Sequence, residues 1–240
     1  MNSMSYNAEY FSIINDLATI SPSMIFTKDD NGTTTVLRAN KSKSIFFRVV
    51  APTNYFEYDG NRIAFNNFAE FYELINVFKV KNLYHDNNLI TIENEVGKIN
   101  YVLANEESLM KSPSKISLDV PDVTFTMSNT QLAEIRKINS LLSSKYCNVF
   151  FKNKMIAFNL YTGEQYNSFN REFTPEYILN ADDPNSPQVG DIEFPIYSEI
   201  FAKLPDETYK VSIYANGFIS FAFQKNDIDV ISGTVKVVKA

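Results

Sequence analysis

The sequence is poor in the residues from which most enzyme sites are built. Its 240 residues include one histidine (His85), one cysteine (Cys147), seven glycines and no tryptophan. A multi-histidine or four-cysteine zinc site and a cysteine-bound iron–sulfur cluster are therefore excluded. One cysteine also excludes an internal disulfide, which fits a reducing compartment. The glycine-rich phosphate-binding patterns GxGxxG and GxxxxGK[ST] do not occur. These absences weaken most enzyme classes.

The two single residues and the carboxylates are the remaining catalytic candidates. His85 lies in the polar sequence NLYHDNN, which predicts a surface loop. Cys147 lies in SSKYCNVFF at the start of an expected strand, which predicts a small core residue rather than a nucleophile. The 28 Asp and Glu residues are scattered along the chain. A hydrolase that depends on carboxylates alone is not excluded by this pattern.

Long apolar runs are also missing, and the overall charge is negative. No run reaches the roughly 20 residues of a membrane helix, so we expect no membrane partner. The formal net charge of −6 is unfavourable for nucleic-acid binding, because phosphates attract Lys and Arg. A ring around DNA, however, needs positive charge only on its inner wall. The distribution of charge therefore matters more than its sum.

Four amphipathic patterns predict helices whose apolar residues face a core. Their ranges are Asn7–Ala18, Asn67–Phe78, Asn129–Ser143 and Pro195–Lys203, with Pro195 in the first turn of the last helix. Strand-like blocks joined by short turns lie between them, which predicts antiparallel neighbours. The blocks of the first half are Met24–Thr27, Thr33–Arg38, Ile45–Val50, Arg62–Phe65, Leu89–Glu93 and Lys98–Leu103. Those of the second half are Val123–Met127, Asn148–Lys152, Met155–Tyr161, Phe169–Tyr177, Tyr209–Tyr214, Phe218–Gln224 and Val230–Val238.

The helix starts repeat along the chain. The second pair follows the first at offsets of 122 residues (from 7 to 129) and 128 residues (from 67 to 195). The pattern predicts an α+β fold with two similar domains, residues 1–110 and 122–240. Residues 111–121 form the expected interdomain linker, because Lys111–Lys115 has the polar, Ser- and Pro-containing composition of one.

Three stretches resemble a known family. The most specific is FPIYSEIFAKLPDETYK (Phe194–Lys210), a short helix, a turn and a Tyr-Lys pair that opens a strand. The others are Asn7–Met24, a helix that closes before a strand, and Asn129–Phe158, a helix followed by a hairpin. On these stretches the chain resembles the DNA polymerase sliding clamp of T-even-type phages, which is related in fold to proliferating cell nuclear antigen. The likeness extends over most of the chain.

The resemblance implies a homotrimeric ring with two clamp-type domains per subunit, helices lining the bore and antiparallel sheets outside. Such a clamp is not an enzyme and uses no cofactor. It encircles double-stranded DNA without sequence preference, tethers the DNA polymerase as a processivity factor, and is opened by an ATP-dependent clamp loader. The resemblance places it in the cytoplasm of the infected bacterial host. An acidic, duplicated phage structural protein and a carboxylate-dependent hydrolase are the alternative functions.

Several cations are candidates for facing DNA in such a ring. Arg136 and Lys137 lie off the apolar face of the third expected helix, and the others follow or end helices. The candidates are Lys79, Arg136, Lys137, Lys145 and Lys203. Cations at helix C-termini are also favoured by the helix dipole alone, which is the alternative explanation for Lys79 and Lys203. The first helix carries Glu9 and Asp16 and no cation.

Two further surfaces are expected from the ring. Pro175 interrupts Phe169–Ile178, and proline favours edge strands. We therefore expect this strand to pair head to tail with Lys98–Leu103 of a neighbouring subunit. The interface candidates are Lys98, Asn100, Val102, Arg171, Phe173 and Pro175.

The partner-binding surface is expected in the linker. Its second half, Ile116–Pro121, has an apolar residue at every other position, as an extended segment with one covered side requires. Ile116, Leu118 and Val120 are predicted to line a groove for a short apolar peptide of the polymerase. The alternative is that these three residues only attach the linker to its own domain.

Overall fold

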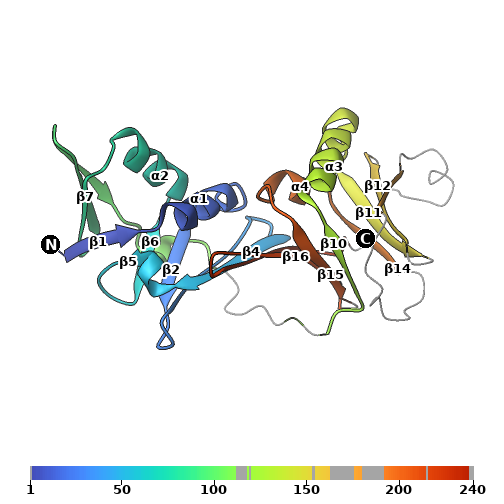
Figure 1. Ribbon diagram of the computed structural model, residues 1–240, viewed down its shortest axis with the longest axis horizontal. Coiled ribbons are helices and arrows are strands. Elements are labelled where there is room, and N and C mark those ends of the chain that lie inside the picture. Colours follow the sequence, from blue (N-terminus) through green and yellow to red (C-terminus); the bar gives the residue numbers. More distant parts are fainter. Residues whose placement is uncertain are drawn as a thin grey trace. The chain divides into compact units, whose positions relative to one another are not determined.

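The computed structural model describes residues 2–111, 118, 120–152, 155–162, 176–179, 192–214 and 216–237 (Figure 1). The chain forms two compact units. Unit 1 comprises residues 1–115 together with 224–230, and unit 2 comprises residues 116–223 and 231–240. Among the described residues, no helix is both long and apolar enough to cross a membrane.

Unit 1 contains two α-helices, α1 (Ala8–Leu17) and α2 (Phe68–Val77). Short 3-10 helices span Thr53–Tyr55 and Glu106–Ser108. Its strands are β1 (Asn2–Tyr6), β2 (Met24–Lys28), β3 (Thr33–Ala39), β4 (Ile45–Pro52), β5 (Phe56–Glu57), β6 (Arg62–Phe65), β7 (Asn82–Asp86), β8 (Leu89–Glu93) and β9 (Lys98–Val102).

Unit 2 contains α3 (Asn129–Leu142) and the short α4 (Glu199–Lys203). Its strands are β10 (Val123–Met127), β11 (Tyr146–Lys152), β12 (Met155–Tyr161), β13 (Glu176–Leu179), β14 (Ile192–Tyr197), β15 (Tyr209–Tyr214), β16 (Phe218–Lys225) and β17 (Ile228–Val235). The tip of the β16–β17 hairpin, residues 224–230, is the segment that belongs to unit 1.

The two units repeat one order of elements. In each, a strand and a helix are followed by a group of strands, a second helix and a final meander. The first strand pairs antiparallel with the strand that follows the second helix, β1 with β7 and β10 with β15. The strand before the second helix likewise pairs with the strand after the first, β6 with β2 and β14 with β11. The chain is therefore a structural duplication with antiparallel sheets, as the sequence predicts.

The strand order places particular strands at sheet edges. In unit 1 the orders are β5-β1-β7-β8-β9 and β4-β3-β2-β6. In unit 2 they are β13-β12-β11-β14 and β10-β15-β16-β17. Among the described residues, β9 pairs with β8 alone and β13 with β12 alone. The sequence analysis predicts assembly through the strands at these two edges.

Phenylalanines dominate the core of unit 1, where α1 and α2 pack against each other and their apolar faces are buried. The ring centroids of Phe11 and Phe56 lie 4.9 Å apart, and those of Phe65 and Phe71 lie 4.8 Å apart. Each of these four side chains is fully buried. Fully burying one such side chain stabilises a fold by roughly 1.5–3 kcal/mol. The aromatic richness of the sequence is therefore used to hold the helix pair in place.

Side-chain caps set the helix starts. The Asn7 Oδ1 accepts a hydrogen bond from the Tyr10 N–H at 2.9 Å, and Asn67 caps α2 in the same way through the Glu70 N–H. Ser128 and Gln131 form a reciprocal capping box at α3. Asn7 and Asn67, predicted as the first helical residues, are thus caps one residue outside the helices.

The prediction of a helix from Pro195 is wrong in its first half. Pro195 lies in β14, opposite Asn148 of β11, and α4 starts only at Glu199. Phe194 and Ile196 are buried while the residues beside them are exposed or partly exposed, so the period is that of a strand. Because β14 is an edge of its sheet, the missing N–H of proline is tolerated there.

The prediction of a surface loop around His85 is also wrong. His85 lies in β7, opposite Asn2 of β1 and Ile90 of β8, and is buried. Its Nε2 is 2.9 Å from the backbone oxygen of Asn87. The sequence of β7 is polar and predicts a loop when it is considered alone. In the structure β7 is a strand because it pairs with β1, whose own polar sequence does not indicate a strand.

Candidate DNA-facing, assembly and partner surfaces

The exposed side of the unit 1 helix pair is acidic. Glu9 and Asp16 on α1 and Glu70 and Glu73 on α2 are partly or fully exposed, and neither helix contains Lys or Arg. The candidate Lys79 follows directly after the C-cap of α2, is exposed, and has a left-handed backbone (φ 48°). Positive charge in this region therefore comes from the end of α2 and not from the helix faces.

Glu9 is partly neutralised by the hairpin tip of unit 1. Its Oε1 lies 3.4 Å from the Lys225 Nζ, and its Oε2 accepts a hydrogen bond of 2.6 Å from the Asn226 side chain. The Asn226 hydrogen bond, together with Lys225, lowers the pKa of the Glu9 carboxyl. No sequence signal links residues 9 and 225, because the contact depends on the tertiary fold. Lys225 is a cation beside α1 that sequence reasoning missed.

Arg136 has an intramolecular role. Its Nε donates to the Phe201 carbonyl oxygen at 2.7 Å, and one terminal nitrogen donates to the Leu204 carbonyl oxygen. Its other terminal nitrogen lies 3.5 Å from the Asp206 carboxylate. These contacts bind α3 to the C-terminal end of α4, where carbonyl groups lack helical partners. Arg136, a candidate for facing DNA, is therefore engaged within unit 2, and reversal of its charge would disturb the contact between α3 and α4.

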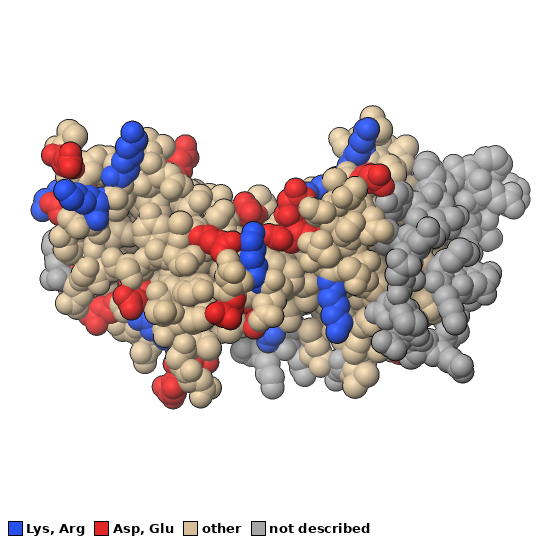
Figure 2. Space-filling view, viewed as in Figure 1, with Lys and Arg blue, Asp and Glu red and all other residues tan. Residues whose placement is uncertain are grey.

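The other candidate cations of unit 2 are more accessible. Lys137 is exposed on α3, and Lys145 is exposed in the connection to β11. The Lys145 Nζ lies 5.3 Å from the centroid of the Tyr146 ring. Lys203 is the last residue of α4 and is half-buried. The face shown in Figure 2 carries Lys and Arg side chains singly or in small groups with acidic side chains nearby, and no single basic patch dominates it.

The predicted assembly strand β9 has one covered and one exposed side. Lys98, Asn100 and Val102 are exposed, while Tyr101 between them is buried. The Lys98 Nζ forms an ion pair of 2.9 Å with Glu93 on β8, which raises the pKa of Lys98 and lowers that of Glu93. In unit 2, β13 (Glu176–Leu179) coincides with the C-terminal end of the strand predicted to pair with β9 of a neighbouring subunit. Arg171, Phe173 and Pro175 lie outside the described residues.

The predicted partner-binding residues of the linker are described in part. Leu118 is half-buried, Val120 is 89% exposed, and Ile116 lies outside the described residues. Because the Val120 side chain is exposed, it contributes little apolar burial that would hold the linker against its own domain.

The single histidine and the single cysteine, which were considered for catalysis, are both buried. Cys147 is fully buried in β11, and burial raises the pKa of its thiol, which disfavours the reactive thiolate. Within the described part of the chain, no three His, Cys, Asp or Glu side chains gather in a group that could hold a metal ion.

The chain shares its duplicated fold with solved structures of PCNA-type sliding clamps. Proliferating cell nuclear antigen from Entamoeba histolytica superposes with a TM-score of 0.73 at 12% identity, covering 99% of this chain and 98% of that one. The A. fulgidus PCNA bound to the C-terminal region of FEN-1 superposes with a TM-score of 0.72 at 9% identity, and the match covers the whole of both chains. PCNA from Thermococcus kodakaraensis superposes with a TM-score of 0.71 at 12% identity, covering 98% of this chain and 99% of that one.

The similarity is structural. No protein-family model matches the sequence, and no curated protein matches it. The expected α+β fold of two duplicated clamp-type domains is confirmed.

Proposed function

We propose that this protein is a sliding clamp, a non-enzymatic processivity factor that encircles duplex DNA as a homotrimeric ring. The observation that carries the proposal is the end-to-end structural match to PCNA-type clamps, in which nearly the whole of each chain is covered. A fold shared over a single domain would suit many functions. The match extends over both units of the duplicated fold, which favours the ring that gives such proteins their function.

Ring closure is proposed through the two open edges, β9 of one subunit and the β13 edge of the next. Edge strands leave backbone N–H and C=O groups unpaired, and a second chain can supply their partners. Because the two edges belong to different units, the contact is head to tail and closes a ring when its rotation is one third of a turn.

DNA contact is proposed through Lys79, Lys137 and Lys145, with Lys203 at the end of α4 in a secondary role. A closed ring cannot leave duplex DNA sideways, so each contact can be weak. A few exposed lysines then suffice for sequence-independent attraction to the phosphates.

The proposed partners are a DNA polymerase and an ATP-dependent clamp loader, reached through the linker around Leu118 and Val120. That the A. fulgidus PCNA was solved with the C-terminal region of another protein bound supports a peptide-binding role for this fold. The proposed origin, a T-even-type phage acting in the cytoplasm of its bacterial host, is based on the sequence resemblance alone.

The proposed function is tested by threading. The protein is incubated with linear duplex DNA that is fixed to a bead at one end, the free end is then blocked with streptavidin, and the beads are washed in high salt. A sliding ring enters over the free end and is retained. Blocking the end before the protein is added should abolish retention.

Equal retention in both orders of addition, or none in either, would contradict the clamp. Turnover of a phosphodiester or glycoside in metal-containing buffer would instead support a carboxylate-dependent hydrolase. Assembly into large particles without DNA would support a structural protein.

A further inference from the structure

The equivalent helices of the two units, α1 and α3, can be compared position by position. Each follows the first strand of its unit (Figure 1) and begins after a side-chain cap, Asn7 in unit 1 and Ser128 in unit 2. The residues four and seven positions after each cap are apolar and fully buried. They are Phe11 and Ile14 in α1, and Leu132 and Ile135 in α3. The two helices therefore present the same register to their own cores.

Asp16 and Lys137 occupy matched positions in this register and have opposite charges. Each lies nine residues after its cap (from 7 to 16 and from 128 to 137), and each is exposed. The position before them is occupied by Asn15 in α1 and by Arg136 in α3, and the Arg136 guanidinium is engaged with α4. The exposed charge at this point of the duplicated fold is therefore negative in unit 1 and positive in unit 2.

The stability of α1 does not account for Asp16. Asp16 lies in the last turn of the helix, where the partial negative charge of the helix C-terminus favours a cation instead. The negative sign also extends over the helix pair, because α1 and α2 together contain four carboxylates and neither Lys nor Arg. By contrast, α3 contains two cations, Arg136 and Lys137, and the single carboxylate of Glu134. The difference in charge between the equivalent helices therefore points to a role outside the helix itself.

We infer that Asp16 is a repulsive determinant of DNA binding, which opposes the attraction that Lys137 exerts from the equivalent helix. The inference rests on the proposed clamp function, in which the helices of both units line the bore. Phosphates attract a lysine and repel a carboxylate, so α3 holds the duplex while α1 keeps it at a distance. The small net attraction suits a ring that is retained by its closure, because weak phosphate contacts are exchanged readily as the ring moves along DNA.

The test changes the charge at position 16 and measures binding of the intact protein to a short linear duplex with open ends, by fluorescence anisotropy across a salt series. Asp16→Lys should tighten binding about fivefold or more, the factor that one lysine–phosphate contact contributes in water. The affinity should also become more sensitive to salt. Asp30→Lys is the matched control, since Asp30 is exposed in the turn between β2 and β3 and the net charge changes equally. The control should change the affinity by less than about twofold, because salt screens distant exposed charges.

Double variants then remove net charge from the comparison. Lys137→Asp should weaken binding, and adding Asp16→Lys should recover most of the lost affinity, because the cation is moved to the matched position of α1. Adding Asp30→Lys to Lys137→Asp restores the same net charge and should recover little. Asp16→Asn removes the repulsion alone and should give a smaller gain than Asp16→Lys. If Asp16→Lys does not fold, Asp16→Asn decides the matter.

Two results would overturn the inference. One is an unchanged affinity in both Asp16 variants, and the other is an equal gain from Asp16→Lys and Asp30→Lys, which would show an effect of net charge alone. The threading experiment on the unaltered protein separates this failure from that of the clamp. If the unaltered protein threads and the Asp16 variants bind DNA as it does, only the role of Asp16 is contradicted. If the unaltered protein does not thread, the clamp itself is contradicted.

Discussion

Arg136 lies on α3, but its guanidinium binds the carbonyl groups at the end of α4. Periodicity places it off the apolar face of its helix, and in that sense the sequence predicts its position correctly. What periodicity does not provide is the identity of the neighbouring element, which lies 65 residues further along the chain. Lys137, the next residue, is exposed. Two adjacent cations thus have different roles that only the tertiary structure separates.

Arg136→Met should destabilise unit 2 by about 2 kcal/mol, because it leaves the carbonyl oxygens of Phe201 and Leu204 without their charged donor. Lys137→Met, the matched control, should change the free energy of unfolding by less than about 0.5 kcal/mol. Urea unfolding monitored by circular dichroism measures both. Equal stabilities of the two variants would contradict the bridging role of Arg136.

Reversing the charge of the exposed lysines tests their part in DNA binding. The double variant Lys79→Glu/Lys137→Glu should keep its fold and weaken DNA association. In a plot of the logarithm of the binding constant against the logarithm of the salt concentration, the steepness of the slope should fall by about one for each phosphate that the protein no longer neutralises. The measurement is DNA binding across a salt series.

Lys41→Glu combined with Lys43→Glu is the control, since both lysines are exposed in the turn between β3 and β4 and the net charge changes equally. A lysine with tertiary contacts would be a poor control; Lys28 at the end of β2 is one, because its Nζ donates to the Tyr58 carbonyl and lies 3.8 Å from the centroid of the Tyr58 ring. If control and test variants bind DNA alike, the assignment of Lys79 and Lys137 fails.

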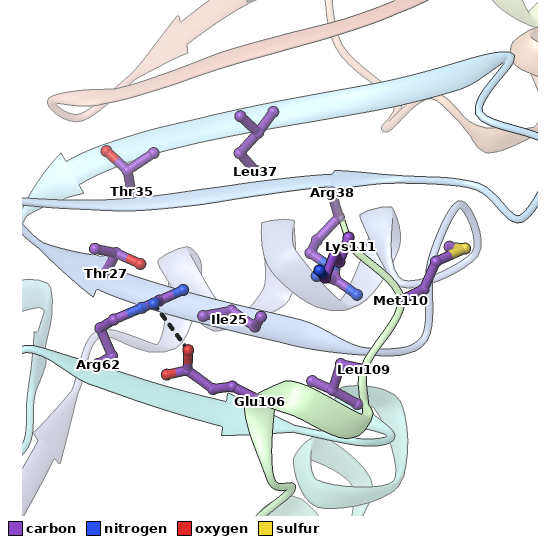
Figure 3. Close-up of a pocket in the computed structure, with 10 residues that line it drawn as sticks. All are labelled: Ile25, Thr27, Thr35, Leu37, Arg38, Arg62, Glu106, Leu109, Met110 and Lys111. Carbon is purple, nitrogen blue, oxygen red and sulfur yellow. Dashed lines mark ion pairs between the residues drawn. The ribbon is translucent and has the colours of Figure 1, made fainter. Parts of the chain in front are cut away.

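At the scale of elements, local patterns predict most of the fold. Two strands that lie between turn signals, Arg62–Phe65 and Val123–Met127, have the predicted bounds, and the second also alternates between buried and partly or fully exposed residues. Errors arise where a strand depends on its neighbours. Polar β1 and β7 are stabilised by pairing with each other, and β14 combines strand alternation with a proline that also suits a helix start. The pocket of unit 1 that is lined by Ile25, Leu37 and Leu109 (Figure 3) could not be predicted, because its walls come from segments that are far apart in the sequence.

The linker prediction concerns a single side chain of an extended segment. Leu118→Asp should abolish binding of a C-terminal peptide of the polymerase while the trimer mass and Tm are preserved, because Leu118 is only half-buried. Fluorescence anisotropy of the labelled peptide provides the measurement. Unchanged peptide binding would contradict the groove, and a general loss of stability would show that the residue attaches the linker to its domain.

At the scale of the whole molecule, the proposed assembly depends on β9. Val102 is 63% exposed on this edge strand, which fits a residue that is covered only in an oligomer. Val102→Asp should dissociate the trimer without unfolding the subunit. Val96→Asp is its control, since Val96 is 92% exposed in the turn before β9 and has no predicted role in assembly. Analytical ultracentrifugation of both variants gives the masses, and a trimer of normal stability for Val102→Asp would exclude this edge as the interface.

The central claim is the closed ring of three, and the mass of the unaltered protein in solution tests it most directly. One subunit has a mass of 27.4 kDa, so three give about 82 kDa. Light scattering across a concentration series should show this trimer at tens of micromolar, where a specific interface is occupied, with smaller species on dilution. A strict monomer of 27.4 kDa throughout the series would contradict the account.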